Sequence, residues 1–230
     1  MNTWLYPVSD GYVMVDTGYE NSYGSVVKQL GKLNIQPEDV VCLFLTHAHD
    51  DHAGFLKKWM QNHPHTAVYA QEKAIAGLRR GQNSFEGGCS SWLAYLFCQL
   101  MALLGNGEHR YPSLSEAQLA KIIPLGSENL SAAEQRLGGR IFFTPGHTED
   151  SVSLLVDGNL FCGDGAMNGI PSLHRITIWV EDPAAYERSW ETMLSSGAKE
   201  IYPAHGKPFS PEQLKKNKKW IRRMRLRPLK

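Results

Sequence analysis

The residues best suited to chemistry lie in the segment His47–His52, which reads HAHDDH and holds three imidazoles and two carboxylates. It directly follows the apolar run Val40–Leu45, which has the length of a buried strand. Because side chains alternate along an extended backbone, His47 and His49 point to one side and can reach one ion. Asp51 and His52, the last two residues of the segment, follow where the chain turns and can face a neighbouring metal position. The segment therefore predicts a metal site at the end of a strand.

Three further ligand-type side chains, His147, Asp164 and His205, also stand at the ends of strand-like segments. Their surroundings read TPGHT, CGDG and PAHG, so each lies beside glycine or proline. Four such strand ends in one chain are not expected by coincidence. By contrast, we expect the isolated residues His63, His65 and His109 to be ordinary polar surface groups. His174 lies in a loop after the Asp164 motif, and an ordinary loop histidine is the favoured interpretation. His174 is also the candidate substrate-binding residue.

Strands and helices alternate along the chain, which favours a layered α/β arrangement. The predicted strands are Thr3–Tyr6, Tyr12–Val15, Val40–Leu45, Ala67–Ala70, Arg140–Phe143, Ser153–Val156, Leu160–Cys162, Arg175–Val180 and Glu200–Tyr202. The predicted helices are Ser25–Leu33, Ala53–Met60, with Asp50 or Asp51 at its N-terminus, and Pro183–Ser195. Residues of about 72–123 break this rhythm and predict a helical insertion. Its apolar stretch Trp92–Leu104 is too short to span a bilayer.

Composition is that of an ordinary soluble protein, with 42% hydrophobic and 20% charged residues in 230, so we expect a single domain over residues 1–230. The near-zero net charge hides an asymmetry, because the tail 215–230 holds nine Lys or Arg and no acid. The cysteines form no CxxC pair and are expected to be buried free thiols. The N-terminus does not read as a secretory signal, so a cytoplasmic location is expected.

The order of these motifs, HxHxDH, TPGHT, GD and PAHG, resembles the metallo-β-lactamase superfamily of hydrolases, in particular its glyoxalase II and lactonase-like members. The opening segment Val13–Gly18, which reads VMVDTG, fits the resemblance too. The resemblance implies a four-layer αββα sandwich with both metals at one edge of its sheets. It also implies the ligand sets: His47, His49 and His147 for one metal, Asp51, His52 and His205 for the other, and Asp164 as the bridge.

Such a site implies a dinuclear metal-dependent hydrolase with two divalent ions. Imidazole and carboxylate ligands suit zinc, which we expect, and also iron or manganese. A water held between two cations ionises near pH ~7, so a metal-bridging hydroxide is the expected nucleophile. Asp51 is expected to be a ligand, and a carboxylate at this position could also orient the water or transfer its proton. The expected substrate is a small molecule with an ester-like bond: a lactone, thioester or carboxylic ester.

The sequence also allows activities other than ester hydrolysis. A phosphodiesterase or nuclease is the second choice, and a single-iron persulfide dioxygenase would draw ligands from the same motifs. A structural metal module is disfavoured because structural zinc sites are usually closed and rich in cysteine. The basic tail could contact nucleic acid or an anionic membrane, but a solvated terminal helix is the favoured interpretation. The insertion could form a lid, a core element or the surface of a homodimer.

Overall fold

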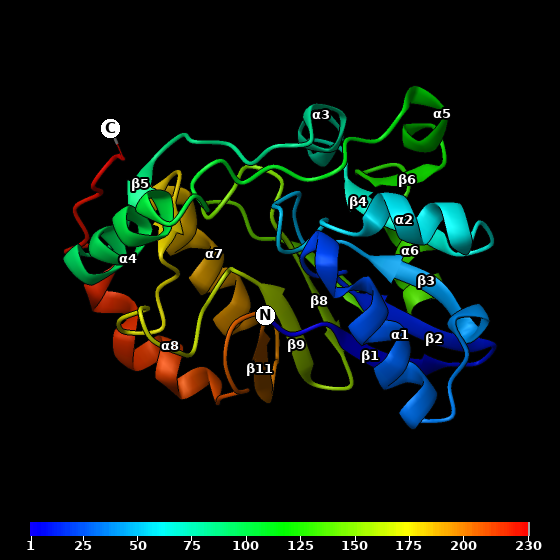
Figure 1. Ribbon diagram of the computed structural model, residues 1–230. Coiled ribbons are helices and arrows are strands. Elements are labelled where there is room, and N and C mark those ends of the chain that lie inside the picture. Colours follow the sequence, from blue (N-terminus) through cyan, green and yellow to red (C-terminus); the bar gives the residue numbers. More distant parts are fainter. Residues whose placement is uncertain (230) are drawn as a thin grey trace. The chain divides into compact units, whose positions relative to one another are not determined.

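A computed structural model of the protein describes residues 1–229 and divides into two compact units. Unit 1 comprises Met1–Asn83 and His109–Gly138. Unit 2 comprises Ser84–Glu108 and the chain from Gly139 onward. Figure 1 shows the elements of both units. Each unit contains its own sheet and its own apolar core, so each is described by itself.

Unit 1 is built on a five-stranded sheet in the order β1-β2-β3-β4-β6. The hairpin of β1 and β2 is antiparallel, and the remaining strands pair in parallel. The strands are β1 (Trp4–Val8), β2 (Gly11–Val15), β3 (Val40–Phe44), β4 (Ala67–Gln71) and β6 (Ile122–Leu125). The helices are α1 (Tyr23–Lys32), α2 (Leu56–Asn62), α3 (Ala74–Arg80), α5 (Glu116–Leu119) and α6 (Leu130–Leu137), with short 3-10 turns η1 (Glu20–Ser22) and η2 (Pro37–Asp39).

The core of unit 1 explains why its central strands read as unbroken apolar runs. Leu43 of β3 and Val68 of β4 lie in one cluster with Leu56 and Trp59 of α2. A parallel strand covered by helices requires apolar side chains on successive positions. The loop that follows β3 therefore leaves a strand that is buried at every residue but Val41, and it carries the HAHDDH segment.

Unit 2 is built on a four-stranded sheet in the order β11-β9-β8-β7. Its strands are β7 (Arg140–Phe143), β8 (Val152–Val156), β9 (Asn159–Gly163) and β11 (Glu200–Pro203), and a separate two-stranded sheet joins β5 (Gly88–Cys89) to β10 (Trp179–Val180). β8 is antiparallel to both β7 and β9, and β11 is parallel to β9. Strands β7, β9 and β11 therefore run in one direction, and their carboxyl ends share one edge of the sheet.

Helix α7 (Pro183–Ser195) covers the core of unit 2. Asp182 caps its N-terminus by accepting hydrogen bonds from the amides of Ala184 and Ala185. Tyr186 and Trp190 are fully buried in the cluster that also contains Leu160 of β9. The other helices of unit 2 are α4 (Trp92–Leu103), α8 (Pro211–Asn217) and the 3-10 turn η3 (Lys218–Trp220).

Two predicted elements were wrong in extent. Of the predicted strand Arg175–Val180, only the last two residues form one, since the backbone at Arg175 is left-handed with φ +66° and breaks an extended run. Helix α2 begins at Leu56 rather than Ala53, and neither Asp50 nor Asp51 caps it, because turns occupy the intervening residues. The other predicted strands and helices are confirmed within a few residues.

The cysteines and the apolar stretch Trp92–Leu104 lie outside the ligand-bearing loops. Cys42, Cys89 and Cys162 are buried free thiols as expected, and Cys98 is half-buried. The apolar stretch Trp92–Leu104 is a helix over Trp92–Leu103. Among residues 1–229, no helix is long and apolar enough to cross a membrane.

Candidate metal centre

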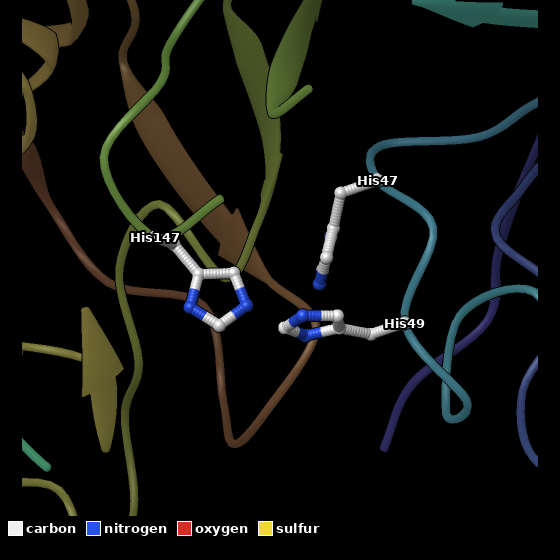
Figure 2. Close-up of side chains that lie close together, drawn as sticks. All are labelled: His47, His49 and His147. Atoms are coloured by element: carbon white, nitrogen blue, oxygen red, sulfur yellow. The ribbon is translucent and has the colours of Figure 1, made fainter. Parts of the chain in front are cut away.

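The loop after β3 presents the four ligand-type residues of unit 1. His47, His49 and His52 are buried, and Asp51 is nearly so. The rings of His47 and His49 lie 4.7 Å apart and those of His47 and His52 lie 3.8 Å apart, between centroids. His52 Nε2 is 3.7 Å from Asp51 Oδ1. The loop therefore gathers imidazoles and a carboxylate as the sequence predicted, and Figure 2 shows His47 and His49 leaving it.

Asp16, at the end of β2, fixes the orientation of His52. Its Oδ2 lies 2.8 Å from His52 Nδ1, and its Oδ1 accepts a hydrogen bond of 2.8 Å from the amide of Thr46. A carboxylate only accepts, so the Nδ1 of His52 carries the proton and the Nε2 has the lone pair that a metal needs. Thr46 Oγ1 also contacts Asp16 and lies 3.1 Å from Nδ1 of His47. The buried carboxylate of Asp16 thus orients His52 directly and contacts His47 through Thr46.

Asp50 ties this loop to the two points where the chain leaves and re-enters unit 1. Its carboxylate accepts from Asn83 Nδ2 at 2.8 Å and lies 3.3 Å from His109 Nδ1. The amide of Asp50 in turn donates to Asn83 Oδ1 at 2.7 Å. The side chain of His109 is 39% exposed, as expected of a surface group, and it also supports the ligand loop through Asp50.

In unit 2 the three predicted ligands lie together, because each follows one of the three strands that run in the same direction. His147 follows β7, Asp164 follows β9 and His205 follows β11. The two oxygens of Asp164 point to different histidines: Oδ2 is 3.8 Å from His147 Nε2, and Oδ1 is 3.6 Å from His205 Nε2. One carboxylate thus lies between two imidazoles, with one oxygen directed to each.

The orientation of His147 is set by backbone groups of unit 2. Its Nδ1 lies 2.8 Å from the carbonyl oxygen of Trp179, so Nδ1 donates and Nε2 carries the lone pair that could bind a metal. The preceding Gly146 has φ +128°, and a Cβ there would come within 2.3 Å of the amide nitrogen of Tyr186. Only glycine permits this close approach of the loop to α7. Figure 2 also shows the imidazole of His147.

Acidic side chains lie near this loop. The amide of Glu181 donates to the carbonyl of Gly146 at 2.8 Å, and its Oε2 accepts from the amide of Glu149 at 3.0 Å. Burial, with a smaller contribution from the charges of Asp150 and Glu86, raises the pKa of Glu181 to about 7, against the lowering effect of hydrogen bonds from Ser84 and Glu149. The surroundings of His147 in unit 2 are therefore rich in carboxylates.

Replacing Glu181 with glutamine should stabilise the protein in a pH-dependent way. The folded-state pKa of about 7 exceeds the ordinary value of 4.5, so the wild type loses stability as pH rises between these values. Relative to wild type, Glu181→Gln should gain about 2 kcal/mol in free energy of unfolding between about pH 5 and pH 8, after allowance for partial exposure. Urea unfolding of both proteins at the two pH values measures this gain. The exposed Glu128→Gln serves as control, and an equal gain there would contradict the assignment.

Other histidines have structural contacts. His174 stacks on Trp220, with ring centroids 4.2 Å apart and planes at 8°; its contact with substrate stays a prediction. His63 is buried, 3.0 Å from the hydroxyl of Tyr23 and packed on Trp59, so the expectation of a surface group was wrong. His65 is exposed, and its Nε2 lies 3.1 Å from the carbonyl oxygen of Glu38.

Comparison with known proteins defines the class. The family model of the metallo-beta-lactamase superfamily matches residues 2–205. The chain therefore belongs to the metallo-β-lactamase superfamily, whose members are mostly metal-dependent hydrolases. It is 29% identical over 213 residues to the metallo-beta-lactamase fold-containing protein ST1585 of Sulfurisphaera tokodaii, covering 90% of this chain and 73% of that protein. It is 27% identical over 205 residues to metallo-beta-lactamase domain-containing protein 1 of Mus musculus, covering 86% of this chain but only 61% of the mouse protein.

Solved structures show the same fold. A B3 metallo-β-lactamase with an active-site glutamic acid matches with a TM-score of 0.65 and 18% identity, over 95% of this chain and 80% of that one. TTHA1623 in a di-iron-bound form matches with a TM-score of 0.63 and 18% identity, over 94% and 92% of the two chains. The predicted fold class, an α/β fold of the metallo-β-lactamase type, is confirmed.

Proposed function

We propose that the ligand-type residues hold two divalent metal ions, and that the protein hydrolyses an ester-like bond in a small molecule. The observation that carries the proposal is the position of Asp164, whose two oxygens are directed to two different histidines. A carboxylate placed in this way would be able to contact two ions, one through each oxygen. The proposal is supported by the sets of side chains that could hold a metal ion: His47, His49 and His147; His47, His52 and Asp164; and Asp51, His52 and His205.

The spacing of ligand atoms within each unit fits such ions. Two atoms that each lie ~2.1 Å from a tetrahedral ion are about 3.4 Å apart. The separations of 3.6, 3.7 and 3.8 Å in the pairs His205–Asp164, Asp51–His52 and His147–Asp164 are close to this value. Hydrogen bonds at Nδ1 of His52 and His147 leave Nε2 as the ligand nitrogen of both. The donor set contains no thiolate and suits zinc, with iron or manganese as alternatives.

Two bound cations would supply an ionised water near neutral pH and offset negative charge on the reacting oxygen. The protein's own residues then have separate tasks. Asp51 is the carboxylate proposed to orient the attacking water or take its proton, in addition to ligation. Asp16 and the carbonyl of Trp179 hold two of the imidazoles in the tautomer that ligation requires.

Charge near the site favours an ester-like substrate over a nucleic acid. Glu86, Asp150 and Glu181 lie close enough to interact, and Glu181 binds the loop that carries His147. A polyanionic backbone would be repelled by Glu86 and Asp150 and, above about pH 7, also by Glu181, whereas a lactone, thioester or carboxylic ester carries no such charge. We therefore place phosphodiester hydrolysis second.

The test is a substrate panel run with metal analysis on the same sample. Lactones, thioesters, aryl esters and phosphodiesters are offered to protein purified without added metal. Two metal ions per chain and turnover of one ester class support the proposal. Faster turnover of phosphodiesters would give the second candidate function. One iron per chain with consumption of oxygen on a persulfide would refute hydrolysis.

A further inference from the structure

Helix α4 presents an unusually apolar surface to solvent. Its sequence, WLAYLFCQLMAL, contains no charged residue, and Ala94 is its one buried residue. Leu100 is 52% exposed and Leu103 is 84% exposed. The side chains exposed on α4 and at its C-terminal end include Trp92, Leu93, Leu96, Leu100, Leu103 and Leu104. A helix that is apolar on all sides is normally covered, so this surface requires an occupant.

The last part of a strongly basic segment, at Arg227, is fixed beside this helix in unit 2. The segment, residues 215–229, contains eight Lys or Arg and no acid. Its Arg227 exchanges two backbone hydrogen bonds with Cys89 of β5, of 2.9 and 3.0 Å, immediately before α4. The guanidinium of Arg227 also lies over the ring of Trp92, 5.6 Å from its centroid. Figure 1 shows the red C-terminal part of the chain beside β5 and α4.

Most of the positive charge of the basic segment is not neutralised by ion pairs. In the described part of the chain, Lys218 pairs with Glu191 and Arg222 pairs with Glu187. Arg223 and Arg225 are exposed and belong to neither of these two ion pairs. Apolar side chains and unneutralised cations therefore occupy neighbouring parts of one unit.

We propose that α4 and the basic segment form a binding surface for an anionic lipid bilayer. Leucine side chains would enter the boundary between headgroups and acyl chains, and Lys and Arg would contact lipid phosphates and carboxylates. Trp92, whose ring contacts Arg227, is of the residue type found at the level of the headgroups. The helix lies along the membrane and does not span it, because 12 residues reach only ~18 Å.

A second copy of the chain and a nucleic acid each fit this surface less well than an anionic bilayer. A second copy docked symmetrically through α4 would bring two basic segments together, and their like charges would repel. A nucleic acid would neutralise the cations but would leave the exposed leucines of α4 without a partner. An anionic bilayer satisfies both the apolar and the cationic parts of the surface.

The test is flotation of the full chain with lipid vesicles. The protein should bind vesicles of phosphatidylcholine with phosphatidylserine, bind phosphatidylcholine alone much more weakly, and lose binding as salt is raised. The double variant Leu100→Glu/Leu103→Glu should weaken binding at least about tenfold. Arg223→Gln/Arg225→Gln should weaken it about fivefold for each cation removed.

Matched controls lie on α1 of unit 1 and at its C-cap, Leu33. Leu33→Glu alters a leucine that is 64% exposed, and Lys28→Gln/Lys32→Gln removes two exposed cations; both should bind vesicles as wild type does. Metal content is measured on every variant and should not change, which separates this proposal from the proposed function.

Three results would overturn the proposal. The first is a wild-type protein that ignores anionic vesicles. The second is a dimer in sedimentation that Leu100→Glu/Leu103→Glu dissociates, with no lipid binding. The third is tighter binding to an oligonucleotide than to vesicles, unaffected by the leucine substitutions.

Discussion

Replacing Asp164 with alanine is expected to remove at least one metal ion per chain and to lower hydrolysis about 10³-fold, a loss of ~4 kcal/mol in transition-state stabilisation. The reason is geometric, since its two oxygens lie 3.8 and 3.6 Å from the Nε2 atoms of His147 and His205. Without the carboxylate the two imidazoles have no shared anionic partner. Metal analysis and turnover of the fastest substrate of the panel measure the two losses.

A comparison of substitutions makes this prediction specific. Asp164→Asn retains one carbonyl oxygen but loses the negative charge and the second acceptor, so it should keep one metal more readily than Asp164→Ala and still hydrolyse poorly. Asp10→Asn, which alters an exposed carboxylate paired with Arg136, should leave metal content and turnover unchanged. Two metals per chain and near wild-type turnover in Asp164→Ala would exclude the bridging role.

The ligand-type residues were predictable because their signal is local. Each stands at the end of an apolar, strand-like run, beside glycine, proline or another ligand-type residue, and such short-range patterns are visible in a sequence. The strand order of unit 2 then explains why His147, Asp164 and His205 meet, although 58 residues separate the first from the last. Their proximity depends on the common direction of β7, β9 and β11. The sequence predicted the class of fold but not this strand order.

The supporting groups could not be predicted in the same way. Asp16 contacts His52 from 36 positions away, and its sequence context suggests only the end of a strand. The partner of His147 is the backbone carbonyl of Trp179, and a carbonyl leaves no mark in the residue type. The interrupted strand before Trp179 was also missed, since His174 and Arg175 adopt left-handed backbone conformations that non-glycine residues seldom show.

Asp16 is the residue for which stability and metal binding should separate most clearly. It is 2% exposed, and its carboxylate accepts from the amide of Thr46 and from Nδ1 of His52. Asp16→Ala leaves these buried donors without their acceptor, so we expect a loss of about 3–5 kcal/mol in free energy of unfolding. Urea unfolding of the metal-free protein measures it.

Asp16→Asn should instead preserve most of the fold and damage metal binding. Its amide oxygen can still accept from Thr46, but its NH₂ group faces His52 and forces the imidazole to carry its proton on Nε2, the nitrogen needed for ligation. We expect metal affinity to fall about 10- to 100-fold, measured by competition with a chromogenic chelator. Wild-type affinity in Asp16→Asn would show that the carboxylate only stabilises the fold. A loss of affinity with an intact unfolding transition would establish that Asp16 sets the tautomer of His52, and so links the end of β2 to the chemistry of the loop after β3.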